Sequence, residues 1–171
     1  MIARIVYRAS QTARHLRRRP SPEVDATLQA LLPHAQWELL ARMAPADRRH
    51  ALRVHQALVR RGFCDTDLLT AALLHDCGKL DGDSRVTIVH RVLKVLLNRI
   101  RPERLYSLAN GRDGWLRSGL HLAVYHHEIG ARLARSCGAT ERTCWFIEHH
   151  DDGRIPADTA LAALQEADAR E

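Results

Sequence analysis

The strongest constraint in the sequence is the run Leu68–Lys79, in which apolar residues lead directly to an adjacent histidine and aspartate. The run reads LLTAALLHDCGK and is apolar on nearly every side of a helix. It is shorter than the roughly 20 residues that span a bilayer, so it predicts a central helix of a folded core. Burying a lone carboxylate costs several kcal/mol, so Asp76 needs a partner there. A metal cation is a partner that His75 and Asp76 can share.

The composition favours a helical protein with reduced thiols. Leu and Ala carry the apolar content and aromatic residues make up only 5%, which favours helix over strand. The four cysteines form no CxxC pair and no signal-peptide pattern is present, so we expect a cytoplasmic protein, or one peripheral to a membrane. The net charge of +6 favours anionic partners such as nucleotides, nucleic acid or lipid headgroups.

Residues 1–45 are expected to form a basic, helical N-terminal extension. Residues 1–19 contain six arginines and no acidic residue. They predict either a basic amphipathic arm that contacts an anionic membrane or nucleic acid, or a solvated helix packed on the domain by its few apolar residues. Ser21 and Pro22 predict a helix start, Pro33 ends that helix, and residues 36–43 predict a short second one.

Residues 46–171 are expected to form a single domain, a bundle of helices. Helices are predicted over residues 46–61 and 86–98, and a further one is expected to pass through residues 125–131 and to stop at Gly138. Asp65, Thr140 and Asp158 predict the N-caps of three others. Since no stretch alternates cleanly between apolar and polar residues, the predicted fold class is all-α.

Histidines and aspartates recur on the apolar helix faces. His50 shares a face with Val54 and Leu58, whereas His55 is a weaker rival. Imidazoles and carboxylates without thiolates suit Fe, Mn, Zn or Mg. Two divalent ions bridged by Asp76 would use all the candidate metal ligands, which are His50, His75, Asp76, His126, His149, His150 and Asp168. Consecutive residues of a helix point about 100° apart, so it stays open whether His149 or His150 binds the metal directly.

Over about residues 46–170 this pattern resembles the HD-domain superfamily of metal-dependent phosphohydrolases. The superfamily has a first histidine, a His-Asp pair at the end of the next helix and a distal aspartate, which are similar to His50, His75-Asp76 and Asp168. The extra histidines resemble those of the two-metal members, such as the HD-GYP phosphodiesterases. They are His126 in HHEIGA and the pair His149-His150, and Lys79 resembles a lysine that many members carry.

The sequence also departs from these relatives. It lacks the Gly-Tyr-Pro segment that follows the histidine pair in HD-GYP proteins, so specificity for cyclic-di-GMP is not supported. Residues 150–154, HDDGR, resemble the His-x-x-Gly-Arg of HD-type diadenosine-tetraphosphate hydrolases. The segment between Asp76 and His126 is longer than usual, which implies a different roof over the substrate pocket.

The resemblance implies a metal-dependent phosphohydrolase or phosphodiesterase that uses a metal-bound hydroxide. Its expected substrate is a phosphoester or phosphoanhydride, such as a nucleotide or dinucleotide. Asp76 and Lys79 are the expected catalytic residues, the first bridging the ions and the second holding a phosphoryl oxygen. Two alternatives stay open, namely a regulatory module that binds metal and nucleotide with little turnover, and a membrane- or RNA-associated protein that acts through its basic helices.

Overall fold

The computed structural model describes residues 21–111, 113–152 and 157–171. Within them the fold is all-α, as the sequence predicts. The only strands in these ranges are two residues long, β1 (Leu80–Asp81) and β2 (Ser84–Arg85), and they pair antiparallel. No helix of the described ranges is long and apolar enough to cross a membrane. The basic arm predicted for residues 1–19 lies outside the described residues.

The chain divides into two compact units. Among the described residues, the insert unit lies within residues 79–126, and the core unit lies within residues 21–78 and 127–171. The division falls inside α8 (Gly114–Ser136), between His126 and His127.

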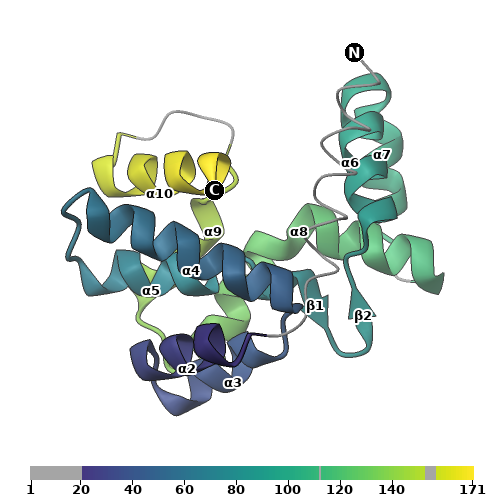
Figure 1. Ribbon diagram of the computed structural model, residues 1–171. Helices are drawn as coiled ribbons and strands as arrows, with labels where there is room; N and C mark the ends of the chain where they lie inside the picture. Colours follow the sequence, from purple (N-terminus) through teal and green to yellow (C-terminus); the bar gives the residue numbers. More distant parts are fainter. Residues whose placement is uncertain (1–20, 112, 153–156) are drawn as a thin grey trace. The chain divides into compact units, whose positions relative to one another are not determined.

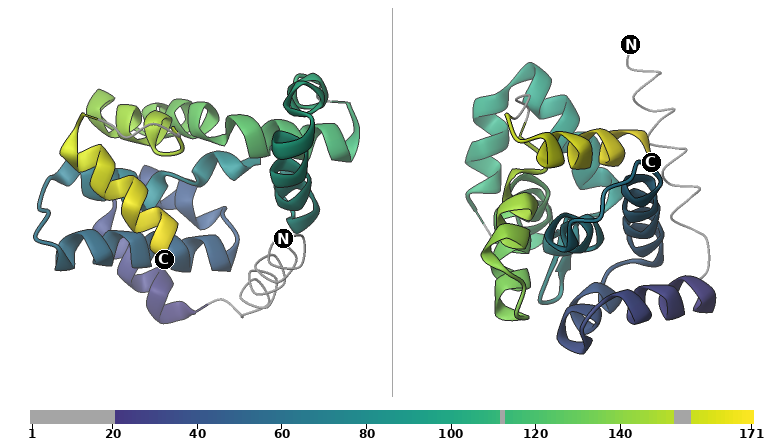
Figure 2. Two further views of the ribbon diagram at one scale, coloured as in Figure 1. Left: turned by 90° about the horizontal axis from the view of Figure 1, so that it is seen from above. Right: turned by 90° about the vertical axis from the view of Figure 1, so that its left-hand side faces the viewer.

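In the core unit, four helices bring their ends and faces together. α4 (Pro45–Arg60) packs along α5 (Thr66–Leu74), and α9 (Glu141–His149) packs on α5. α10 (Thr159–Arg170) contacts both α4 and α5. It lies next to α4 in Figure 1, and the left view of Figure 2 shows this yellow helix over the blue ones. The C-terminal end of α5 therefore lies beside the faces of α4 and α10.

Short polar side chains fix where these helices begin. Asp65 accepts hydrogen bonds from the backbone N–H groups of Asp67 and Leu68. Thr140 and Asp158 cap α9 and α10 in the same way, so the three predicted N-caps are confirmed. Capping determines the point at which α5 starts, and hence the place where His75 leaves it.

The predicted boundary between residues 45 and 46 does not coincide with a division in the structure. α2 (Pro22–Leu31) and α3 (His34–Ala41) supply Leu28, Leu39 and Leu40 to the same buried cluster as Val54 and Leu68. These helices lack a core of their own, because their apolar faces are covered by α4 and α5.

The insert unit has a smaller core. It contains α6 (Ile88–Ile100), α7 (Pro102–Ala109) and the last residue of the 3₁₀ turn η1 (Cys77–Lys79). α6 confirms the helix predicted over residues 86–98, with both ends two residues later. Leu105 and Ala109 of α7 are buried with Leu120 and Val124 of α8, and Leu93 and Leu97 of α6 pack on them.

Gly119 of α8 lies directly against the ring of His90, and this contact gives a stability prediction. A Cβ atom at residue 119 would lie 2.1 Å from His90 Cε1. The ring is fully buried, bonded through Nδ1 to the Thr87 backbone and packed on Trp115, so it has little freedom to move. Gly119→Ala is expected to destabilise the protein by about 1–3 kcal/mol in urea denaturation. At Gly111, a Cβ atom would contact only the flexible side chain of Arg117, so Gly111→Ala should change the free energy of unfolding little. Equal losses of stability in the two variants would refute the prediction.

Candidate metal centre

Five of the predicted ligands come together in the core unit, from four separate helices. His50 lies on α4, and His75 and Asp76 directly follow α5. His150 is the C-cap residue of α9, and Asp168 lies in the last turns of α10. We call these five residues the metal cluster.

The ligand atoms of the metal cluster lie within hydrogen-bonding or near-contact distance. His50 Nε2 donates a hydrogen bond to Asp168 Oδ1 over 2.7 Å. His75 Nε2 lies 3.3 Å from the same Asp168 oxygen and 3.6 Å from Asp76 Oδ2. The imidazole of His150 is edge-on to that of His75, with ring centroids 5.0 Å apart.

Two of the imidazoles are oriented by the helices that they terminate. His75 Nδ1 donates to the carbonyl of Ala72 over 2.9 Å, and His150 Nδ1 donates to the carbonyl of Ile147 over 2.7 Å. A backbone carbonyl oxygen can only accept a hydrogen bond, so Nδ1 carries the hydrogen in both rings. Each Nε2 is then left to act as an acceptor, which is how a metal-ligating histidine is commonly held.

The centre of the metal cluster is buried. His75, Asp76 and His150 are buried, whereas His50 and Asp168 are partly exposed. Burial and the neighbouring imidazole of His75 lower the pKa of His150 to about 4. Burial alone would raise the pKa of the Asp168 carboxyl, but the hydrogen bond from His50 and the nearby imidazole of His75 hold it well below its usual value. At neutral pH the cluster therefore offers a neutral His150 and a charged Asp168.

A close contact between helices supports the corner that carries His75 and Asp76. A Cβ atom at Gly130 of α8 would lie 3.3 Å from the backbone nitrogen of Gly78. The thiol of Cys77 donates to the carbonyl of Gly130 over 3.5 Å, and burial raises the pKa of this thiol. Gly130 therefore allows α8 to pack onto the turn after Asp76, and Cys77 is an inert part of this packing.

The donor set fits a divalent cation. With bonds of about 2.0–2.2 Å, two ligand atoms on one ion lie about 2.8–3.6 Å apart. The separations of His75 Nε2 from both carboxylates fall in this range. The triads His50/His75/Asp76 and His75/His150/Asp168 each place three ligand atoms within 4.8 Å of one another. Acceptor atoms of two carboxylates and an imidazole converge here, and a cation is what would satisfy them together.

The adjacent histidines of α9 point to different places. His150 belongs to the metal cluster, whereas His149 lines a neighbouring pocket and donates from Nδ1 to Asp152 Oδ2 over 2.8 Å. His149 forms no part of any ligand group among the described residues, so its prediction as a ligand is not supported. The cause is the expected divergence of about 100° between neighbours on a helix.

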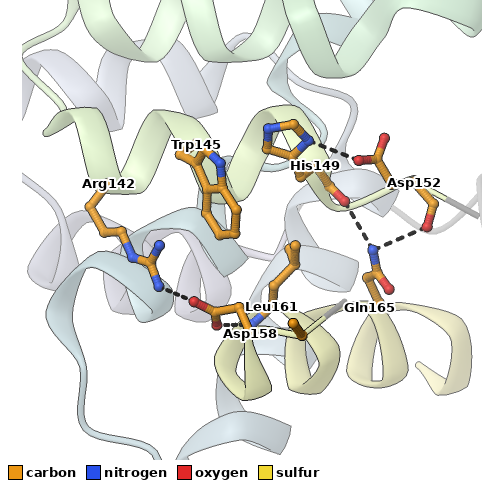
Figure 3. A pocket seen from close by; sticks show the side chains of 8 residues that line it. Arg142, Trp145, His149, Asp152, Asp158, Leu161 and Gln165 are labelled. Atoms are coloured by element: carbon orange, nitrogen blue, oxygen red, sulfur yellow. Dashed lines mark hydrogen bonds and ion pairs between the residues drawn. The ribbon is translucent and has the colours of Figure 1, made fainter. Parts of the chain in front are cut away.

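The pocket beside the metal cluster has a cavity volume of about 370 Å³ and combines aromatic with polar walls. The indole of Trp145 lies between Arg142 and His149 and points toward Leu161 (Figure 3). Arg142 also pairs with Asp158. The sequence shows Arg142, Trp145 and His149 at helical spacing, but the partners on α10 become visible only in the fold.

Gln165 joins the pocket to the metal cluster. Its side-chain amide donates to the carbonyl oxygens of His149 and Asp152 over 2.9 and 3.1 Å. Gln165 lies one turn before Asp168 on α10, and His149 directly precedes His150. The pocket and the cluster are therefore consecutive along the same two helices.

Three further predictions remain untested. His126 is buried and Lys79 is half-buried, but both belong to the insert unit, so their roles as ligand and phosphate contact stay predictions. Gly153 and Arg154, which carry the resemblance to diadenosine-tetraphosphate hydrolases, lie outside the described residues.

Neither a scan of protein-family models nor searches of curated proteins and of solved structures found a match. The assignment of function therefore rests on the residues and their geometry.

Proposed function

We propose that this protein is a metal-dependent phosphohydrolase of the HD type, acting on a nucleotide or dinucleotide. The observation that carries the proposal is the convergence of His50, the adjacent His75 and Asp76, His150 and Asp168. Three imidazoles and two carboxylates in a largely buried corner suit a first-row transition-metal ion such as Fe, Mn or Zn better than Mg²⁺, which prefers oxygen ligands alone. Such an ion, when bound, polarises a phosphoryl oxygen and makes water a better nucleophile at neutral pH.

The chain's own residues would hold and orient this chemistry. Asp168 is fixed by the hydrogen bond from His50, so His50 acts either as a ligand itself or as the group that orients a ligand. Asp76 is almost fully buried, which makes its negative charge effective in holding a cation. His75 and His150 are oriented through their backbone bonds and need no rearrangement to present Nε2.

Within the core unit the geometry supports one ion more directly than two. The two ligand triads of this unit share His75, and its single Nε2 cannot coordinate two ions at once. A second ion, with Asp76 as the bridge, depends on His126 and is retained as a prediction. Metal analysis of the purified protein distinguishes the cases, since two equivalents per chain would support His126 as a ligand.

The aromatic pocket favours a substrate that carries a ring. A cavity of about 370 Å³ exceeds the volume of a nucleobase, and its walls include Trp145 and His149. A phosphate at the metal cluster would place the rest of the substrate toward this pocket, because the two sites are consecutive along α9 and α10. The general test is a substrate panel with Mn²⁺-reconstituted protein that includes a phosphodiester, a nucleotide and diadenosine tetraphosphate; no hydrolysis of any of them would refute the proposal.

Trp145→Ala tests the ring-binding role of the pocket. Stacking on an aromatic side chain is worth about 1–3 kcal/mol per base, so the KM for a nucleotide should rise about tenfold or more. The KM for tripolyphosphate, which has no base, should stay within about twofold. Trp115→Ala, which removes an exposed indole of the insert unit, is the control. If Trp145→Ala raised both KM values equally, the pocket would not bind the ring.

A further inference from the structure

Exposed apolar side chains are concentrated in the insert unit. In the described part of the core unit, the exposed large hydrophobic residues are Leu31 and Val59. The insert unit, which is smaller, exposes six, namely Val89, Val95, Ile100, Tyr106, Trp115 and Leu116. Where exposed apolar side chains of this kind are contiguous, they mark a surface that meets another apolar phase.

The turn from α6 to α7 is the most exposed part of this surface. Ile100, the last residue of α6, is 70% exposed and lies between Arg99 and Arg101. Arg104 follows one turn into α7 and is also exposed. None of these three arginines forms an ion pair with a residue of the described ranges, so their charges are available to a partner. We call Arg99, Ile100, Arg101 and Arg104 the basic turn.

The apolar face of α6 is wider than its own core requires. Leu93 and Leu97 pack on the buried cluster of the insert unit. Successive residues of a helix are rotated by 100° about its axis. Four further apolar residues of α6 therefore fall within an arc of about 80°, next to the face that Leu93 and Leu97 occupy. This apolar stripe consists of Val89, Val92, Leu96 and Ile100. It runs along α6 and ends at the basic turn.

The sequence segment of the insert unit is also strongly cationic. Residues 79–126 contain nine lysines and arginines against four aspartates and glutamates. Residues 19–78 and 127–171, which include the core unit, contain twelve basic and sixteen acidic side chains. The net positive charge of the protein is thus carried by the segment with the exposed apolar residues and by the arginine-rich residues 1–18. The core unit, by contrast, has more acidic than basic side chains.

We propose that the apolar stripe and basic turn form a docking surface for an anionic lipid bilayer. Ile100 and the stripe would enter the boundary between headgroups and acyl chains, and Arg99, Arg101 and Arg104 would contact lipid phosphates. The stripe and the basic turn contain no aromatic side chain on which unpaired bases could stack, so a lipid surface fits better than RNA. A second copy of the chain fits poorly, because two surfaces with the same positive charge repel each other. This inference stands independently of the proposed hydrolase activity.

The test is co-sedimentation of the 171-residue protein with vesicles. Vesicles of 30% phosphatidylserine in phosphatidylcholine should bind it, and pure phosphatidylcholine vesicles should bind it much more weakly. Arg99→Gln/Arg101→Gln/Arg104→Gln should weaken binding to the anionic vesicles by about 100-fold, at about fivefold per arginine. Ile100→Asn, at an exposed site that folding does not need, should weaken it by about tenfold.

Matched variants in the core unit control for charge and for apolar surface. Arg42→Gln/Arg60→Gln/Arg132→Gln removes the same charge, and Val59→Asn removes an exposed aliphatic side chain that is 48% exposed. Both should change vesicle binding by less than about twofold. The proposal would be overturned if the two triple arginine variants lost vesicle binding equally and Ile100→Asn and Val59→Asn did so too. Equal binding to neutral vesicles would also overturn it, as would an Ile100→Asn effect seen only on self-association or on binding to RNA.

Discussion

His75→Ala/Asp76→Ala is expected to lower hydrolysis of the best substrate by at least about a thousandfold. These residues supply the centre of the metal cluster, where His75 Nε2 lies within 3.6 Å of both carboxylates. Loss of a group that only orients a ligand typically costs 10- to 100-fold in affinity or activity, and these two are proposed to be ligands themselves. The measurement is kcat/KM with Mn²⁺ in excess, beside circular dichroism to verify folding.

The control for this variant is His55→Ala. His55 is also a buried histidine of the core unit, on the same helix as His50, but it belongs to no ligand group among the described residues. Its removal should lower stability without lowering the activity of the folded protein. Metal binding can also be measured through stability, because an ion present at a concentration of 100 times its Kd adds about 2.7 kcal/mol to the free energy of unfolding. Mn²⁺ should therefore raise the Tm of wild type and of His55→Ala, but not of the double variant; a double variant that kept full activity would remove the mechanism.

Arg48→Leu is expected to cost about 3–5 kcal/mol of unfolding free energy, the largest stability effect of any single substitution proposed for this protein. The guanidinium is buried and binds both carboxylate oxygens of Asp25, over 2.9 and 3.0 Å. It also donates to the carbonyl oxygens of Ala41 and Met43. Removing the guanidinium leaves the Asp25 carboxylate and two carbonyl groups without their partner, and breaking a buried ion pair in this way typically costs about 3–5 kcal/mol. Urea denaturation measures the change.

Arg42→Leu is the matched control, because Arg42 is an exposed arginine at the end of α3. It should change the unfolding free energy by no more than about 0.5 kcal/mol. Arg48 joins α2 and the end of α3 to α4, so the prediction also tests whether residues 21–45 fold as part of the core unit. A cost below about 1 kcal/mol for Arg48→Leu would contradict that.

The sequence alone was informative wherever a local pattern determines the outcome. Asp65, Thr140 and Asp158 are caps because a short polar side chain can satisfy helix N–H groups within three residues. The position of His50 follows from the 3.6-residue period that it shares with Val54 and Leu58. The adjacency of His75 and Asp76 at the end of an apolar helix needed no tertiary information at all.

Other features depend on tertiary contacts that no local pattern contains. His149 and His150 are equivalent in sequence, and only the packing of α9 on α5 decides which one faces His75. Arg48 carries no motif, and its four hydrogen bonds to Asp25, Ala41 and Met43 require three helices to meet. The division of the chain inside α8 is hidden because a helix continues through it without a break in its periodicity.

Anomalous diffraction from crystals grown with Mn²⁺ tests the central claim most directly. The account predicts a peak within about 2.0–2.4 Å of ligand atoms from His75, Asp76 and Asp168, with His50 or His150 completing the site. A second peak that includes His126 would extend the site to two ions. A peak remote from these side chains, or none at saturating Mn²⁺, would contradict the metal centre and the phosphohydrolase proposal with it.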